Sequence, residues 1–266
     1  MKGHTLFVVG FFISVIASAN IKPFELTGSD KEKGQTIARE IDQRDAGFKD
    51  YIVDAEMILK QDGKVLSVRE FHQKVLEVEG EGDHSVNVFN SPRDVAGTAV
   101  LVHSHGLKPD DQWVYLPAIK RVKRISTRSK SGPFVGSEFA YEDITTWLPE
   151  KYHHRYIQDE NVDGQPCYKL EEIPAYADSG YSKLLQWIDQ EIFLPRKIEY
   201  YDRKGELLKT LTIYDYKEYG GYWRPSKMVM KNNQSGRSTE LLWREYQFAT
   251  GLTASDFAKG KLRRLR

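Results

Sequence analysis

Two histidines and one cysteine are the first candidates for chemistry in this chain. His103 and His105 flank Ser104 in an extended run, so both imidazoles would lie on the same side of a strand and could begin a zinc site. Zinc needs three or four protein ligands, and no companion motif accompanies the pair. Cys167 is the single cysteine and has no histidine or asparagine motif beside it, which favours a buried small hydrophobe over a catalytic thiol. The sequence predicts neither a metal site nor a cofactor.

Other signatures of enzymes are missing from the sequence. It contains no glycine-rich phosphate loop and no Gly-x-Ser-x-Gly elbow. The adjacent carboxylates Glu142-Asp143 and Glu171-Glu172 are expected by chance in a chain with 29% charged residues. We therefore interpret the chain as a binding protein and not as an enzyme.

A basic hairpin is the clearest candidate for a binding surface. Gln112–Leu116 is an aromatic and β-branched run, Pro117 interrupts it, and Arg121–Ile125 returns. Six Lys or Arg residues and no acidic residue lie between Lys120 and Lys130. Such a surface could meet an anionic head group, a membrane surface or an acidic partner; the alternative is a solvated charge run. The side chains with this predicted role are Lys120, Arg121, Lys123 and Arg124.

The loop after the hairpin, residues 126–137, is rich in Ser and Gly yet carries Phe134 and Val135. Loops lie on the surface, so bulky apolar residues there indicate a use, and we predict a movable lid over an apolar ligand. The alternative is a loop anchored by one Phe, with Trp113 and Tyr115 in the core. The residues predicted to contact the ligand are Trp113, Tyr115, Phe134, Val135, Phe139 and Tyr141.

The elements that must position these residues are mostly strands. One helix is expected over Lys31–Arg44, with Asp30 as its cap, and Asp143–Tyr152 is a candidate for a second, short one. Beyond the helix, period-two alternation and turn signals such as Asp62-Gly63 and Asp163-Gly164 recur at short spacing. This pattern predicts a mainly β protein with an antiparallel sheet curved towards a barrel.

Several strands are apolar on both faces, as Leu241 and Trp243 are opposed by Leu242. Such a sheet must be covered on both sides or must line a cavity. Because only one firm helix is available as cover, part of the apolar surface could be reserved for a ligand.

The start of the chain predicts export. Lys2 precedes an apolar run, Leu6–Ala17, and Ala17-Ser18-Ala19 fits a signal-peptide cleavage site. The run is too short to span a bilayer. We expect residues 1–19 to be removed and residues 20–266 to form a single domain. Cleavage lowers Lys plus Arg from 39 to 38, equal to the 38 Asp plus Glu, so nucleic acid is not an expected partner.

The sequence also resembles the LolA-like family of outer-membrane lipoprotein-sorting proteins over nearly the whole of residues 20–266. The motifs that carry the resemblance are Ile37-Ala38-Arg39-Glu40 with Arg44-Asp45, Phe89-Asn90-Ser91-Pro92 with Asp94-Val95-Ala96-Gly97-Thr98-Ala99, Trp113-Val114-Tyr115-Leu116-Pro117-Ala118 with Lys120-Arg121-Val122, Lys130-Ser131-Gly132, Gly136-Ser137-Glu138-Phe139, Tyr141-Glu142-Asp143, and Val162-Asp163-Gly164-Gln165-Pro166-Cys167-Tyr168.

The resemblance implies an unclosed antiparallel half-barrel whose concave face is covered by helices over an apolar cavity. It implies a periplasmic carrier of lipid or acylated protein, often beside an exporter of the resistance–nodulation–division type. The chain is longer than the well-studied lipoprotein chaperone, so lipoprotein, phospholipid and another hydrophobic product of the exporter all stay open as cargo.

We expect a non-enzymatic carrier that shields acyl chains in transit between membranes, touching the donor membrane or an outer-membrane acceptor transiently. A second interpretation is an accessory subunit of an envelope export complex that holds no internal cargo. A hydrolase of envelope lipid is a third.

Export gives the first testable prediction. Protein recovered from the periplasm should begin at Asn20, because the Ala17-Ser18-Ala19 site ends the short apolar run. N-terminal sequencing checks this. A full-length product retained in the membrane would contradict both the compartment and the carrier role.

Overall fold

The computed structural model describes residues 24–265, so the expected signal peptide and its cleavage site lie outside the described residues. The elements are α1 (Asp30–Asp45), β1 (Asp50–Gln61), β2 (Lys64–Leu76), β3 (His84–Ser91), β4 (Ala99–His103), β5 (Asp111–Leu116), β6 (Arg121–Ile125), β7 (Tyr152–Val162), β8 (Gln165–Pro174), β9 (Tyr181–Asp189), β10 (Pro195–Asp202), β11 (Leu207–Tyr219), β12 (Tyr222–Asn232), β13 (Arg237–Trp243) and β14 (Gln247–Phe248), with short 3₁₀ turns η1 (Pro117–Ile119), η2 (Thr127–Ser129), η3 (Phe134–Gly136), η4 (Pro149–Lys151), η5 (Ala254–Phe257) and η6 (Lys259–Arg264).

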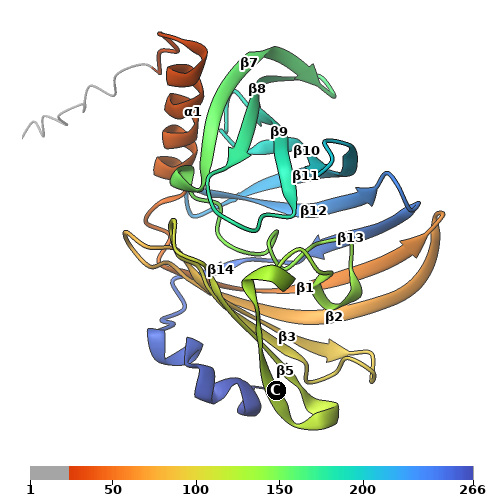
Figure 1. The fold of residues 1–266 in the computed structure, drawn as a ribbon. Coiled ribbons are helices and arrows are strands. Elements are labelled where there is room, and N and C mark those ends of the chain that lie inside the picture. Colours follow the sequence, from red (N-terminus) through yellow and green to blue (C-terminus); the bar gives the residue numbers. More distant parts are fainter. Residues whose placement is uncertain (1–23, 266) are drawn as a thin grey trace, which may run out of the picture.

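The strands of the described residues form one antiparallel sheet of fourteen strands, in the order β6-β5-β4-β3-β2-β1-β13-β12-β11-β10-β9-β8-β7, with β14 also paired to β1. Strands β6 and β7 end this path and do not pair with each other, so the sheet curves without closing (Figure 1). The predicted curved, unclosed antiparallel half-barrel is therefore confirmed. The predicted hairpin is confirmed too, because β5 and β6 pair from Gln112↔Ile125 to Leu116↔Arg121.

One face of the sheet carries a continuous apolar ladder across strands far apart in sequence. Met57 on β1 lies opposite Leu241 on β13, which lies opposite Met228 on β12, while Leu211 on β11 lies opposite Met230. Side chains on alternate positions share a face, so this register places them on the concave side. Burying each such side chain contributes roughly 1.5–3 kcal/mol.

The opposite face is covered at one end by the C-terminal segment. Phe257 in η5 and Leu262 in η6 are buried against Val86, Val88 and Leu101 of β3 and β4. Figure 1 shows these last turns beside β3 and β5, away from α1. The second face of the sheet is thus covered at β3 and β4, whereas Leu242 of β13 is not part of this cluster.

Helix α1 covers one part of the concave face. Ile37 and Ile41 cluster with Leu170 of β8 and Ile188 of β9. The expectation that Asp30 caps the helix is wrong. Ser29 is the N-cap, because its hydroxyl accepts from the backbone N–H of Glu32 while the Glu32 carboxylate accepts from the backbone N–H of Ser29.

The long connection between β6 and β7 covers another part of the concave face. Its Phe134 is 3% exposed and packs with Phe139, Phe89 and Met57 in the main core cluster. The candidate second helix over Asp143–Tyr152 does not form; only Pro149–Lys151 makes a short 3₁₀ turn. We call residues 126–148 the inserted segment. No helix within residues 24–265 is long and apolar enough to cross a membrane.

Gly34 sets how closely α1 approaches β7. A Cβ atom added at Gly34 would lie 2.9 Å from backbone atoms of His154 and Arg155. Ala is favoured over Gly by about 1 kcal/mol in an ordinary helix. Here we expect Gly34→Ala to destabilise the protein by roughly 1–3 kcal/mol, because the helix must move away from β7. Thermal unfolding measures this, with Gln35→Ala on the exposed face of α1 as control. A Gly34→Ala variant as stable as the parent would refute the close packing.

Candidate ligand-binding cavity

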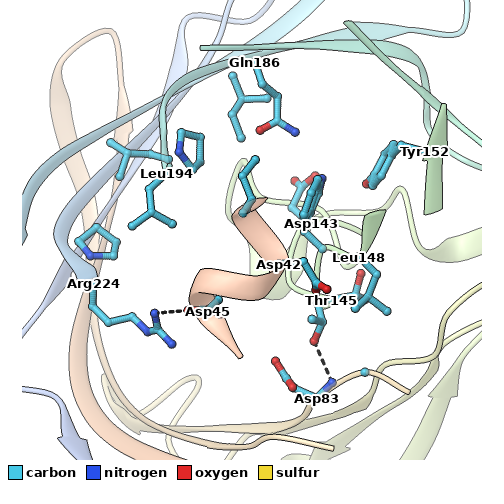
Figure 2. A pocket seen from close by; sticks show the side chains of 18 of the residues that line it. Asp42, Asp45, Asp83, Asp143, Thr145, Leu148, Tyr152, Gln186, Leu194 and Arg224 are labelled. Carbon is cyan, nitrogen blue, oxygen red and sulfur yellow. Dashed lines mark hydrogen bonds and ion pairs between the residues drawn. The ribbon is translucent and has the colours of Figure 1, made fainter. Parts of the chain in front are cut away.

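A cavity of about 720 Å³ opens between α1 and the inserted segment on the concave face of the sheet. Figure 2 shows the C-terminal turn of α1 at this cavity, with Asp42 and Asp45 on the helix and Leu148 and Asp143 from the inserted segment. Sites for small ligands typically occupy roughly 300–1,000 Å³. The cavity therefore has the size expected for a lipid chain or a small amphiphile.

Its wall is the part of the concave apolar face that lies on β9 to β12. The side chains that form it come from alternate positions of four neighbouring strands, so they present one continuous surface. They are Leu184, Ile198, Leu211, Ile213 and Met228. A surface of this kind binds by area and has no directional requirement, which suits flexible hydrocarbon.

A buried ion pair lies beside the wall, with Asp143 in the lining of the cavity and its partner Lys209 behind it. Lys209 of β11 and Asp143 of the inserted segment lie 2.5 Å apart, with side chains only 4% and 3% exposed. Asp143 also accepts hydrogen bonds from the Tyr181 hydroxyl and the backbone N–H of Ala140, and Lys209 donates to the Glu138 carbonyl. These contacts fasten the inserted segment to the sheet beside the cavity.

Glu142 is held by a different set of donors. The hydroxyls of Tyr176 and Ser179 and the backbone N–H of Gly180 donate to its carboxylate at 2.5–2.9 Å. Nearby, Tyr200 lines the cavity with 6% of its surface exposed, and its hydroxyl forms no hydrogen bond with any residue of the described chain. The hydroxyl is not among the fully buried polar atoms that lack a partner, so it is reachable from the cavity and can contact a ligand.

The mouth of the cavity is acidic. Nine Asp or Glu residues line the cavity, whereas Arg224 is the sole Lys or Arg among the described residues that does so. Arg224 is 2.6 Å from Asp45, an ion pair drawn in Figure 2. Burial, with the nearby carboxylates of Glu150 and Asp45, raises the pKa of Asp42. Burial and the carboxylates of Asp45 and Glu77 raise the pKa of Asp83 to about 6.

The apolar residues predicted to contact ligand divide into three groups. Phe139 lines the cavity. Phe134, Val135 and Tyr141 belong to the core cluster of the concave face, and Arg69 donates a hydrogen bond to the Val135 carbonyl. These three residues therefore hold the inserted segment against the sheet. Their contact with cargo stays a prediction.

Trp113 and Tyr115 lie elsewhere. They pack in the cluster of Phe257 and Leu262, on the opposite face of β5 from Val114, which belongs to the concave cluster. The structure therefore places both at the C-terminal cover and not among the residues that line the cavity.

The predicted basic residues lie at the edge of the sheet. Lys120, Arg121, Lys123 and Arg124 are exposed on β6 and its turn, and none lines the cavity. Arg124 pairs with Asp111 on the neighbouring strand. Their contact with a head group or partner stays a prediction. Because these four residues form a surface separate from the cavity, we call them the basic edge.

The sequence reasoning missed the residues that organise the cavity. It assigned the adjacent carboxylates Glu142-Asp143 and Glu171-Glu172 to chance, whereas Glu142 and Asp143 fasten the inserted segment. Glu172 is fully buried and accepts from Trp147 and Gln186 while pairing with His154. A signal was present, because Lys209 interrupts an apolar face of β11 and implies a buried partner.

The histidines and the cysteine that the sequence offered for chemistry make contacts typical of structural residues. His103 stacks on His84 with ring centroids 3.9 Å apart, and its Nε2 lies 2.8 Å from the Phe257 carbonyl. His105 pairs with Glu81. Within residues 24–265 no group of three or more potential metal ligands gathers. Burial raises the pKa of the Cys167 thiol to about 11, which keeps it in the unreactive neutral form.

The raised pKa of Asp83 gives a prediction for stability. Between the ordinary carboxyl pKa of 3.8 and about 6, the folded state binds more protons than the unfolded state, so stability falls as pH rises through this window. We expect Asp83→Asn to be more stable than the parent by roughly 1–2 kcal/mol near neutral pH, and the difference to vanish towards about pH 4. Chemical denaturation over this range measures it, with Glu206→Gln at an exposed turn as control. A difference that stays constant with pH would contradict the assignment.

Comparison with known proteins places this chain in a family. A family model described as "Uncharacterized protein" matches residues 81–264. No curated protein matches the chain. The fold matches a domain from Vibrio parahaemolyticus described as an outer membrane lipoprotein-sorting protein, with 52% identity, a TM-score of 0.86, and coverage of 88% of this chain and 99% of that one.

Two further solved structures extend the comparison. A DUF1329 family protein from Desulfovibrio piger is 33% identical, with a TM-score of 0.85 and coverage of 88% of this chain and 100% of that one. A LolA superfamily protein from Nitrosomonas europaea is 24% identical, with a TM-score of 0.67 over 85% of this chain and 98% of that one, and shares the fold. The chain belongs to the family of the lipoprotein-sorting domain and the DUF1329 protein, and it shares the fold of the LolA superfamily protein.

Proposed function

We propose that this protein is an exported, periplasmic carrier that holds the acyl chains of a lipoprotein or lipid in its cavity and moves them between membranes. The observation that carries the proposal is the open cavity of about 720 Å³ whose wall is the apolar ladder of β9 to β12. The relative from Vibrio parahaemolyticus, described as a lipoprotein-sorting protein, supports the same class of cargo.

The apolar wall can supply the affinity that a carrier needs. Burial of each methylene contributes about 0.8 kcal/mol, so about ten methylenes reach the roughly 8 kcal/mol of a micromolar complex. This gain needs no catalytic group and no cofactor. The cargo leaves again when its chain finds an equally apolar environment in an acceptor or a membrane.

We propose that one of the two covers of the cavity moves when the cargo is released. The loop 126–137 is our proposed lid; it does not line the cavity itself, but it precedes Phe139 and Glu142 in the same inserted segment, and both of these line it. Opening it would withdraw Phe134 from the core at a cost of roughly 1.5–3 kcal/mol. We propose that docking supplies this energy, on an inner-membrane exporter of the resistance–nodulation–division type or an outer-membrane acceptor, through transient contact of the basic edge.

A second candidate function has its own supporting observation. Strand β6 is an edge of the sheet and is exposed and basic, so an acidic partner could add a strand there. In that case the protein is an accessory subunit of an envelope export complex and holds no internal cargo. Mass spectrometry of organic extracts from natively purified protein separates the two, because the accessory subunit would carry no stoichiometric lipid.

Filling the cavity tests the carrier role on the protein itself. Leu184→Trp places a larger side chain into the apolar wall, and we expect it to weaken binding of a fluorescent dodecyl-chain probe by at least about tenfold, because it removes chain-binding area. Leu185→Trp, on the opposite face of β9, is the matched control and should bind normally. Thermal unfolding of both variants, and of the milder Ile198→Phe, shows whether folding is kept. Normal probe binding by a folded Leu184→Trp would refute the cavity as the site.

A further inference from the structure

The charges around the cavity are strongly one-sided. Of the nine acidic residues that line it, three have an ion-pair partner within the described chain: Asp45 with Arg224, Asp143 with Lys209 and Glu81 with His105. The other six have none within residues 24–265. Two of these six accept hydrogen bonds from neutral donors: Glu142 from two hydroxyls and a backbone N–H, and Glu77 from the backbone N–H groups of Gly47 and Lys49. The four that remain are Asp42, Glu79, Asp83 and Glu150.

These four come from three separate elements that meet at the mouth. Asp42 lies on α1, Glu79 and Asp83 lie on the connection between β2 and β3, and Glu150 lies in η4 after the inserted segment. Figure 2 shows Asp42, Asp45 and Asp83 around the same opening. Burial raises the pKa of Asp42 and Asp83, and carboxylates of the lining add to it: Glu150 and Asp45 act on Asp42, and Asp45 and Glu77 act on Asp83. Fold stability alone gives no reason to gather these charges.

A second observation points to a ligand with a polar part. The Tyr200 hydroxyl lines the cavity, belongs to a side chain that is 6% exposed, and has no hydrogen-bond partner among residues 24–265. Its neighbours Asp143 and Glu142 already have their donors. The hydroxyl is not among the fully buried polar atoms that lack a partner, so it is reachable from the cavity and is available to a polar atom of bound cargo.

An anionic head group does not fit this site. It would meet four carboxylates that form no ion pair within residues 24–265, and Arg224, the basic side chain of the lining, is already neutralised by Asp45 at 2.6 Å. The basic edge cannot compensate, because none of its four residues lines the cavity. A positively charged group at the mouth would instead relieve the repulsion among the carboxylates while its hydrocarbon occupies the apolar wall.

We propose that the cavity selects amphiphiles whose polar end is positively charged, such as an amine-bearing acyl compound or a cationic lipidated peptide, and discriminates against anionic lipids. The proposal rests on the carrier function and names the cargo class of the same site. Exposed charges act within a Debye length of about 8 Å at physiological salt. The selection therefore weakens as salt rises, whereas the contribution of the hydrocarbon does not.

Three probes with the same chain and different heads test this class: dodecylammonium, dodecanoate and the neutral glycerol ester of dodecanoate. Calorimetric titration below their aggregation concentrations gives each affinity for the full mature protein. We expect the ammonium probe to bind about tenfold more tightly than dodecanoate at low salt, with the neutral probe between them, since each exposed ion pair contributes modestly. High salt should bring the three affinities together.

Matched charge variants then locate the effect. Asp42→Asn, Asp83→Asn and Glu150→Gln combined remove three charges from the mouth. Asp163→Asn, Glu206→Gln and Glu245→Gln combined remove the same charge from exposed positions that do not line the cavity. The first variant should lose most of the preference for ammonium over dodecanoate, and the second should keep it. Thermal unfolding of both confirms that they are folded.

The outcomes distinguish this inference from the carrier function. If all three probes bind equally, or dodecanoate binds best, the cargo class is wrong and the carrier function stands. If the mouth variant keeps the preference, these carboxylates do not produce it and the inference fails. If no probe binds at any salt concentration, the carrier function itself fails.

Discussion

The buried ion pair between Lys209 and Asp143 decides where the cavity lies. Two charges removed from water at 4% and 3% exposure are tolerated only when they are paired and further hydrogen-bonded, and Tyr181 and Glu138 supply those contacts. The pair joins β11 to the inserted segment, so the segment is fixed over one part of the concave face. The inserted segment leaves the adjoining part of the concave face uncovered. That uncovered part is the apolar wall of the cavity.

An open sheet of this size also needs cover at both faces, and the chain supplies it from its two ends. Helix α1 lies against β7 through Gly34 and buries Ile37 and Ile41, while the C-terminal turns bury Phe257 and Leu262 on the opposite face. With these covers in place, the concave wall between α1 and the inserted segment remains accessible. A cavity in this fold is therefore a consequence of incomplete cover rather than of a cleft between domains.

Local patterns predicted the elements well and the site poorly, for one physical reason. The hairpin of β5 and β6 and the extent of α1 follow from periodicity and turn residues within a short window. The N-cap was misassigned by one residue, because Ser29 and Asp30 are both good caps and only the reciprocal contact with Glu32 decides. The cavity depends on register between strands far apart in sequence, and no local pattern shows that Asp143 meets Lys209.

The charge pattern makes most sense when docking and cargo selection are assigned to different surfaces. The sequence suggested that one segment combines apolar contacts with basic contacts to a head group, but in the fold the basic edge is outside the cavity and the mouth is acidic. Positive charge attracts an anionic membrane, and it serves this purpose without attracting anionic lipid into the cavity only when it lies away from the cargo site. Here Arg121 and Lys123 lie on the edge strand β6. On our two proposals, the acidic mouth would keep anionic membrane lipids out of the cavity while the basic edge would hold the protein near the membrane. A carrier built this way can touch a bilayer without filling its cavity with the bulk lipid of that bilayer.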